Sequence, residues 1–142
     1  MKADQEAVVR ECAARSAAGT ISFGEVVGRL MEAGVERYHA DYCRRENTFY
    51  LPDGSSLVVA MAYGDDAARD AASPEIAAAF SARDVEGAIR KAQRGEIMYP
   101  EFVRLTTAAG CVGYFVQISG RCVQYFGRNG ELHVEPFPGA KI

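Results

Sequence analysis

The sequence predicts an α+β fold: a tandem duplication of an ααβββ unit, with two antiparallel three-stranded meanders and helices packed on one face. Three observations predict it: an internal match at a fixed offset, helix signals repeated at that offset, and turn signals between short alternating segments. Residues 3–59 align with residues 79–135 without a gap, with 12 identities in 57 positions, where about 4 are expected by chance. The identities include Gly19/Gly95, Gly34/Gly110, Tyr38/Tyr114, Arg45/Arg121 and Gly54/Gly130.

We therefore predict that residues 1–142 form a single domain of two repeats, about 3–60 and 79–136, joined by residues 61–78. A chain of 142 residues with 49% hydrophobic residues is long enough and apolar enough to build one buried core. The joint is rich in Ala and Asp, and we interpret its adjacent Asp65 and Asp66 as an exposed linker turn rather than a cation site. The sequence leaves open whether the two sheets join edge to edge or face each other.

Each unit is expected to begin with two helices. The first helices are predicted at about Asp4–Ala18 and about Pro74–Arg94, each ending at a glycine, and Ser81 with Asp84 is a second start signal inside the longer one. The second helix of the first unit starts at Ser22, where Glu25 completes a capping box, and its counterpart starts at 99–101 with a proline in the first turn.

Three strands follow in each unit, and their turns set the register. Asp53-Gly54, Asn129-Gly130 and Ser119-Gly120 are signals for two-residue hairpins, whereas a longer loop through 45–47 is expected in the first unit. This register predicts one core row per unit, covered by the helices: Tyr38–Phe49–Val58 and Tyr114–Tyr125–Val134.

Alternation then places a second set of side chains on the opposite, uncovered face. In the first unit these are Arg37, His39, Asp41, Thr48, Tyr50 and Leu57, and in the second they are Gly113, Phe115, Gln117, Gln124, Phe126, His133 and Glu135. This face differs more between the units than the core face does, so it is the predicted functional surface. The candidate ligand-binding residues are Arg37, His39, Asp41, Tyr50 and His133, and the candidate interface residues are Phe115 and Phe126.

The sharpest chemical candidate is the strand segment that carries Arg37, His39 and Asp41, because their side chains project from one face within about 7 Å of their neighbours. Arg37 would bind an anion, and His39, oriented by Asp41, would move a proton. The alternative is a solvated sheet face. His39 and His133 with Asp41 and Glu135 would form a metal site only if the two sheets faced each other, and we predict no metal site.

Composition and motifs exclude several classes of protein. A net charge of -3 with scattered basic residues argues against nucleic acid as a partner, and no apolar run is long enough to span a membrane. The four cysteines form no metal-binding or CxxC spacing, so free thiols in a cytoplasmic protein are expected. Nucleotide-binding glycine loops, a GxSxG elbow and HExxH are absent, and no cofactor is predicted.

The order of a capped helix ending in Ala-Gly, a strand with a following Tyr, an aromatic pair and a turn ending in Gly resembles a bacterial family of unknown function, some of whose members are labelled phage envelope protein. The residues that carry the resemblance are Glu32–Tyr38, Tyr99–Val103, Ala109-Gly110, Tyr114 and Tyr125–Gly130. The resemblance implies a small intracellular protein and assigns no catalytic residue.

Two classes of function remain from the sequence. The first is an uncharacterised small soluble protein that acts as a non-enzymatic binding module, either for a small polar or anionic ligand or for a protein partner, with a homodimer formed through the uncovered face. The alternative is a small enzyme that uses the His/Arg/Asp cluster. The binding module is preferred because the sequence brings no nucleophile and base together.

Overall fold

A computed structural model describes residues 1–61 and 75–139. Within these residues the chain forms four helices and one six-stranded antiparallel sheet, which confirms the predicted α+β class. The elements in order are α1 (Ala3–Ala18), α2 (Phe23–Glu32), β1 (Arg37–Asp41), β2 (Glu46–Tyr50), β3 (Ser56–Ala60), α4 (Ala82–Gln93), α5 (Tyr99–Ala108), β4 (Cys111–Gln117), β5 (Cys122–Gly127) and β6 (Leu132–Pro136).

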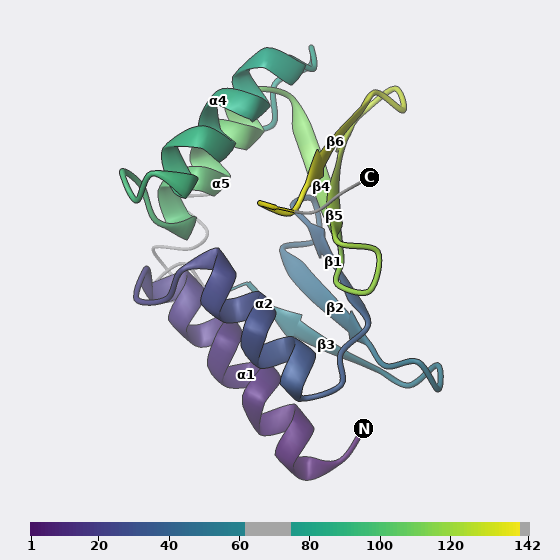
Figure 1. The fold of residues 1–142 in the computed structure, drawn as a ribbon. Coiled ribbons are helices and arrows are strands. Elements are labelled where there is room, and N and C mark those ends of the chain that lie inside the picture. Colours follow the sequence, from purple (N-terminus) through teal and green to yellow (C-terminus); the bar gives the residue numbers. More distant parts are fainter. Residues whose placement is uncertain (62–74, 140–142) are drawn as a thin grey trace.

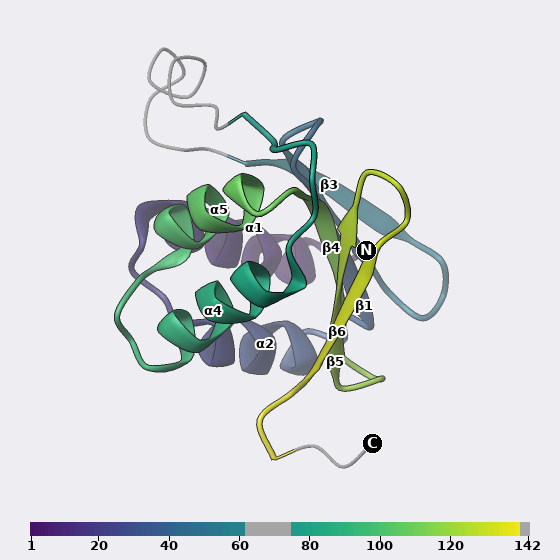
Figure 2. The same cartoon turned by 90° about the horizontal axis from the view of Figure 1, so that it is seen from above.

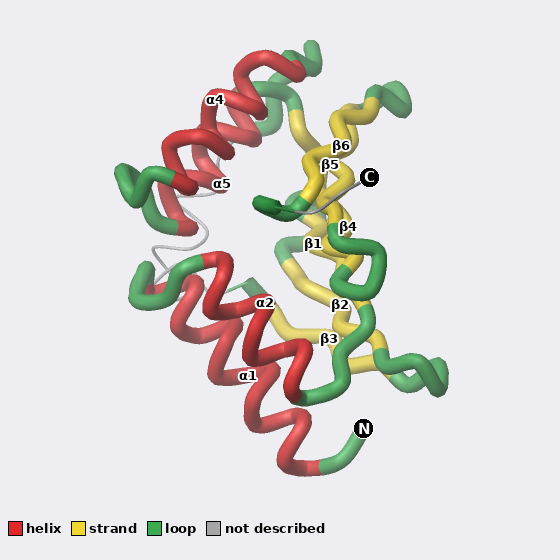
Figure 3. The backbone as a smooth tube through the Cα atoms, viewed as in Figure 1, coloured by secondary structure: helices red, strands yellow, loops and turns green. Residues whose placement is uncertain are grey.

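The two meanders join edge to edge, because the sheet has the order β3-β2-β1-β4-β5-β6. The four helices lie on one side of it, with α1 and α2 beside each other and α4 and α5 beside each other (Figure 1; Figure 3 shows the same view with helices in red and strands in yellow). Seen from above, the molecule has a helical layer and a strand layer, and the other face of the sheet has no helix on it (Figure 2).

The central pairing of β1 with β4 relates the two halves of the sheet. In its antiparallel register His39 lies opposite Phe115, and these two positions differ by the same 76 residues that separate the matching segments of the sequence. The strands on either side follow in mirrored order. The uncovered face is therefore centred on the contact between these two rings.

The helix ends agree with their signals, with one exception. Ser22 and Glu25 form the capping box of α2, and Gly34 and Gly110 follow the last turns of α2 and α5 with φ of 88° and 84°. The prediction that the first helix of the second unit starts near Pro74 is wrong, because α4 starts only after Ser81, whose hydroxyl oxygen accepts a hydrogen bond from the backbone N–H of Asp84.

The chain before α4 instead runs as a connection tied to the end of α5. The amide of Ala77 donates to the carbonyl of Thr107, and the amide of Ser81 donates to the carbonyl of Ala109. The carbonyl of Thr107 also accepts from the amide of Gly110, so the connection adds hydrogen bonds to carbonyl groups at the end of α5, where the helix supplies few. The joint between the units lies mostly at residues 62–74, so Asp65 and Asp66 fall outside the described residues.

The inner hairpins have the predicted strand register but not the predicted turns. Tyr38 pairs with Phe49 and Tyr114 pairs with Tyr125, as expected. Both connections contain four residues, 42–45 and 118–121, and both end in an arginine with positive φ, 55° and 59°. The two-residue turn at Ser119-Gly120 and the longer loop in the first unit are both wrong. The predicted pairing of the inner strands is nevertheless correct, because a two-residue turn and the observed four-residue turn have the same central point in the sequence.

The outer hairpins differ from the prediction by one residue. In each of them five residues, 51–55 and 127–131, separate the last paired positions of the two strands, so Phe49 pairs with Leu57 and Tyr125 pairs with His133. A shift of one residue turns every side chain of a strand to the other face. The predicted core valines of β3 and β6 therefore lie on the uncovered face, whereas Leu57, His133 and Glu135 point toward the helices.

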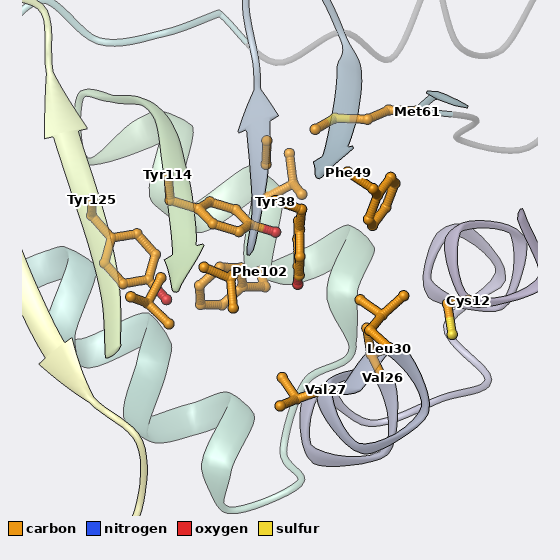
Figure 4. Packing of buried hydrophobic residues seen from close by; sticks show 14 of the residues in the cluster. Cys12, Val26, Val27, Leu30, Tyr38, Phe49, Met61, Phe102, Tyr114 and Tyr125 are labelled. Carbon is orange, nitrogen blue, oxygen red and sulfur yellow. The ribbon is translucent and has the colours of Figure 1, made fainter. Parts of the chain in front are cut away.

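Aromatic side chains of the middle strands make the centre of the core. The Tyr38 ring lies 5.0 Å from that of Phe49, and Tyr114 lies 5.4 Å from Tyr125. Figure 4 shows these rings between the sheet and the helices, with Phe102 of α5 beneath them.

Among the described residues, none of the helices has the length and apolar character that a membrane span requires.

Candidate ligand-binding cleft

The residues predicted from the sequence lie on two different faces. Arg37, His39, Asp41 and Tyr50 are on the uncovered face, in agreement with the predicted alternation. The predicted placement of His133 on that face is wrong, because the shift in the outer hairpin turns it toward α4. His39 and His133 therefore belong to opposite sides of one sheet and do not come together.

On the uncovered face, each member of the predicted cluster has a structural partner. The guanidinium of Arg37 lies 4.3 Å from the centre of the Tyr50 ring and 2.5 Å from the carboxylate of Glu36. The His39 ring stacks on Phe115 with centroids 4.5 Å apart. These contacts describe a packed surface, so the arginine does not present a free charge to an anion.

Asp41 serves the turn rather than the histidine. Its Oδ1 accepts the backbone amides of Cys43 and Arg44, at 2.9 and 3.1 Å. Aspartate commonly accepts such bonds at the start of a turn. No hydrogen bond joins Asp41 to His39 in the described structure, so the proton relay of the enzyme hypothesis is not assembled. A ligand-binding role for these residues stays a prediction.

The interface candidates lie in the half of this face that β4, β5 and β6 supply. Phe115 and Phe126 are half-buried and pack edge to face, with centroids 6.5 Å apart. Leu132 and Val134 beside them are 51% and 42% exposed. Outward-pointing positions on these three strands carry no charged side chain: Gly113, Phe115, Gln117, Cys122, Gln124, Phe126, Leu132, Val134 and Pro136.

A large cleft lies on the other side of the sheet, between its core face and the helices. Its volume is about 1010 Å³, at the upper end of the range of small-molecule sites. Side chains of both units line it, from α1, α2, α4, α5 and the strands. Aromatic rings dominate the wall: Phe23, Tyr38, Phe49, Tyr99, Phe102, Tyr114, Tyr125 and Phe137.

The sheet wall of the cleft holds a buried amide whose oxygen lacks a hydrogen-bond partner among the described residues. Asn47 of β2 points to the helix side, between Ala40 of β1 and Val59 of β3 in the register, and is 9% exposed. Its Oδ1 accepts no hydrogen bond from any described residue. Buried side-chain acceptors are nearly always satisfied, so an exception requires an explanation.

The same wall holds, toward the other edge of the sheet, a buried carboxylate that has partners. Glu135 of β6 accepts from Arg90 of α4 at 2.5 Å and lies 3.3 Å from Nε2 of His133. Arg90 also bonds Glu86 and Gln93. The carboxylate beside Arg90 raises the pKa of its guanidinium, so this wall carries a paired, not a free, charge.

The hydroxyl groups of the buried tyrosines form hydrogen bonds within the core or lie at residues that line the cleft. Tyr42 bonds the hydroxyl of Thr106 at 2.9 Å, and Tyr114 donates to Tyr99 at 2.8 Å. Burial raises the pKa of all four buried tyrosines, Tyr38, Tyr42, Tyr114 and Tyr125. These groups therefore act as neutral, partly polar surface at ordinary pH.

Sequence reasoning missed the cleft, although part of its signal was present. The predicted register places Phe49 on the core face, and alternation then puts Asn47 on the same face two residues earlier. An amide at an inward strand position is the available signal. Glu135 could not be found in this way, because its face depends on the five-residue loop.

Two further expectations concern metals and thiols. Among residues 1–61 and 75–139, no group of three His, Cys, Asp or Glu side chains is arranged to hold a metal ion. Cys12, Cys43, Cys111 and Cys122 are free. Burial raises the pKa of Cys12, which lines the cleft.

A comparison with protein families finds a match for the second half of the chain. A family model described as a protein of unknown function, DUF1398, matches residues 68–136, which is just under half of the chain and spans most of the second unit. No curated protein matches the chain. The expected likeness to a family of unknown function is confirmed for this segment, and the phage label stays an expectation. Over residues 68–136 the chain is therefore similar to proteins whose family has no assigned function.

Proposed function

We propose that the protein is a non-enzymatic binding module that holds a small, largely apolar molecule in the cleft between the sheet and the two helix pairs. The observation that carries the proposal is the cleft itself, about 1010 Å³ in volume and walled by aromatic rings from both units. Such a site removes most of a small molecule's surface from water, and each buried apolar Å² contributes about 25 cal/mol.

The packing of native interiors supports an occupant for this space. Protein cores are close-packed, and a void deprives its lining of attractive contacts. Here Tyr38, Tyr125 and Phe102 are buried and yet line the cleft. A ligand would supply the missing contacts without displacing any element of the fold.

The chemistry of the lining favours binding over catalysis. The one thiol that lines the cleft belongs to Cys12, and its raised pKa makes it a poor nucleophile. The buried carboxylate of Glu135 is held in an ion pair with Arg90. Neither group is placed as an activated nucleophile beside a base.

A matched pair of variants on α1 tests the proposal. Ala17 lines the cleft and Ala14 is exposed on the same helix. The dye 1-anilinonaphthalene-8-sulfonate serves as probe because its fluorescence rises in apolar sites. We expect wild type and Ala14→Trp to bind the dye equally, and Ala17→Trp to bind it more weakly, since the added indole would occupy part of the cleft. Equal binding by all three refutes the proposal.

A second role, self-association through the uncovered face, has one specific observation in its favour. The β4–β6 half of that face carries no charge and exposes Leu132 and Val134. A second copy of this chain would bring the same uncharged patch against it, as a twofold interface requires. The five-residue segments of these strands that pair with one another cover only about 250 Å² of the sheet, well below the roughly 800 Å² per partner of a stable interface. Any homodimer would therefore be weak, and Phe126→Asp should abolish it in sedimentation velocity at high concentration.

We also infer that the two units are copies of one ancestral ααβββ element. The 12 identities at one offset and the repeated element order support this inference. The antiparallel pairing of His39 with Phe115, which occupy matching positions in the two units, supports a pseudo-twofold relation between them. A cleft between the two helix pairs would then lie where the two copies meet.

A further inference from the structure

We propose that the cleft binds a neutral aromatic carbonyl compound, whose carbonyl oxygen accepts hydrogen bonds from the hydroxyl groups of Tyr38 and Tyr125. The inference rests on the proposed function and names the ligand chemistry of the same site. It starts from two tyrosine side chains that line the cleft and are each 6% exposed. Neither hydroxyl group forms a hydrogen bond with any described residue.

The other two buried tyrosines show what these hydroxyl groups lack. Tyr42 bonds the hydroxyl of Thr106 at 2.9 Å, and Tyr114 donates to Tyr99 at 2.8 Å. Buried polar side-chain atoms are nearly always satisfied in this way. The two free hydroxyl groups are exceptions, and both belong to residues that line the cleft.

The two free hydroxyl groups also have access to the cleft. Among the described residues, the only fully enclosed polar side-chain atom without a partner is Oδ1 of Asn47. The hydroxyl oxygens of Tyr38 and Tyr125 lack a partner but are not enclosed in this way, so each keeps accessible surface. Because both residues line the cleft, a molecule within it can reach these oxygens.

Both side chains project from the sheet toward the helices. Tyr38 is on β1 and Tyr125 is on β5, with β4 between them, and Figure 4 shows their hydroxyl ends directed away from the strands. Burial is the main cause of the raised pKa of Tyr125, and the hydroxyl of Tyr38 raises it further. The two groups are therefore near enough to interact, and one molecule can lie against both.

A carbonyl oxygen is the group that fits two such hydroxyls. Because burial raises the pKa of both, each hydroxyl stays protonated and offers a donor. A carbonyl oxygen has two lone pairs and can accept from both. The ring pairs Tyr38–Phe49 and Tyr114–Tyr125 favour an aromatic body for the ligand, since rings gain from offset and edge-to-face contacts with further rings.

The charges of the cleft favour a neutral molecule. Its charged lining residues are Arg90, Arg121 and Glu135. Arg90 and Glu135 pair with each other at 2.5 Å, and Arg121 is exposed to solvent. An anion among the buried rings would lose its hydration and find no free buried cation among the described residues, which makes its burial costly.

Fluorenone and fluorene are a matched probe pair, because both are flat tricyclic molecules and differ in a carbonyl group against a methylene group. The affinity for each follows from its displacement of 1-anilinonaphthalene-8-sulfonate. We would measure both probes on wild type, on Tyr38→Phe, on Tyr125→Phe and on the double variant. Tyr50→Phe is the matched control, since it removes a tyrosine hydroxyl from the uncovered face.

A neutral hydrogen bond changes affinity by about 2- to 12-fold. We expect each single variant to weaken fluorenone binding within that range and the double variant to weaken it more, while fluorene binding stays within about twofold of wild type. Tyr50→Phe should leave both affinities unchanged. The carbonyl stretching band of bound fluorenone should lie at lower frequency in wild type than in the double variant, because hydrogen bonding weakens the C=O bond.

The variants should fold as stably as wild type, because the hydroxyl groups that they lose have no partner among the described residues; circular dichroism checks this. Equal weakening of both probes by the double variant, or no weakening of either, would overturn the inference and leave the proposed function standing. A loss confined to one single variant would overturn the assignment to the other tyrosine.

The dye separates failure of this inference from failure of the proposed function. If neither probe displaces the dye from wild type, yet Ala17→Trp binds the dye more weakly than Ala14→Trp does, the inference is overturned and the binding cleft is not. Equal dye binding by wild type and both α1 variants would overturn the proposed function itself.

Discussion

Four buried tyrosines should make the protein unfold cooperatively in alkali. Burial raises the pKa of Tyr38, Tyr42, Tyr114 and Tyr125 above the value in the unfolded chain. The neutral, protonated hydroxyl is the form that the fold accepts. Their contribution to stability is therefore fully present below the unfolded pKa of about 10 and is lost as pH rises above it.

The size of the effect follows from linkage. At a pH one unit above the unfolded pKa, the hydroxyl is mostly ionised in the unfolded chain but stays protonated in the fold. Each such hydroxyl then lowers the free energy of unfolding by about 1.4 kcal/mol, which gives about 4–6 kcal/mol for the four. A domain of this size is typically stable by about 5–15 kcal/mol. The loss is thus a large part of the total, and unfolding should be complete within about one further pH unit.

The assay follows tyrosinate absorbance and far-ultraviolet circular dichroism in the same pH titration. We expect these four tyrosines to ionise together with the loss of helix signal, in one steep transition above pH of about 10. Tyr38→Phe should make the transition less steep, by about one proton. Gradual ionisation of all tyrosines with the helix signal intact would refute the burial argument.

Two further predictions test the local geometry. Gly34 and Gly110 occupy equivalent positive-φ positions after α2 and α5, yet a Cβ at Gly110 would overlap the backbone of Ala79, whereas at Gly34 it meets no backbone. In chemical denaturation Gly34→Ala should lower the free energy of unfolding by about 1–2 kcal/mol, and Gly110→Ala should lower it by about 2–5 kcal/mol. If the two substitutions lowered it by similar amounts, the result would contradict the packing of the segment before α4 against Gly110. The exposed thiol of Cys43 should react with a disulfide reagent at once at pH of about 8. Burial raises the pKa of Cys111 to about 11, so its thiol should react only when the protein unfolds. Fast reaction of both thiols in the folded protein would contradict the burial of Cys111.

The parts of the fold that the sequence predicts correctly are those that local chemistry determines. The glycines after α2 and α5 adopt positive φ, which few other residues accept. The inner strands align correctly because Tyr38 and Phe49 are equidistant from the turn centre whichever turn type forms. Local signals of this kind do not depend on what packs above them.

The outer hairpins were mispredicted because turn signals do not fix loop length. Gly54 has positive φ, as a two-residue turn also requires, but here it is the fourth residue of a five-residue loop. The amide of Leu51 donates to the carbonyl of Ser55 across that loop, while the Leu51 side chain is buried in the core. Burial of a loop side chain is a tertiary effect, and the spacing of Asp53-Gly54 does not contain it.

The buried polar side chains differ in what they contribute to the stability of the fold. The buried polar residues among those described are Asn47, Thr106, Thr107 and Glu135. The two threonines donate to carbonyls of their own helix, and Glu135 pairs with Arg90. Each of these three groups contributes to the structure it lies in, so replacing it would cost stability.

Asn47 is different, because its acceptor contributes nothing to the apoprotein. Replacing it with leucine should stabilise the empty fold, since the unpaired acceptor costs about 1–3 kcal/mol. A side chain that costs stability in the free protein has a physical rationale only if another state of the protein satisfies it. The Asn47 side chain lines the aromatic cleft and is 9% exposed, but Oδ1 itself has almost no accessible surface, so a donor reaches it only if the amide turns toward the cleft.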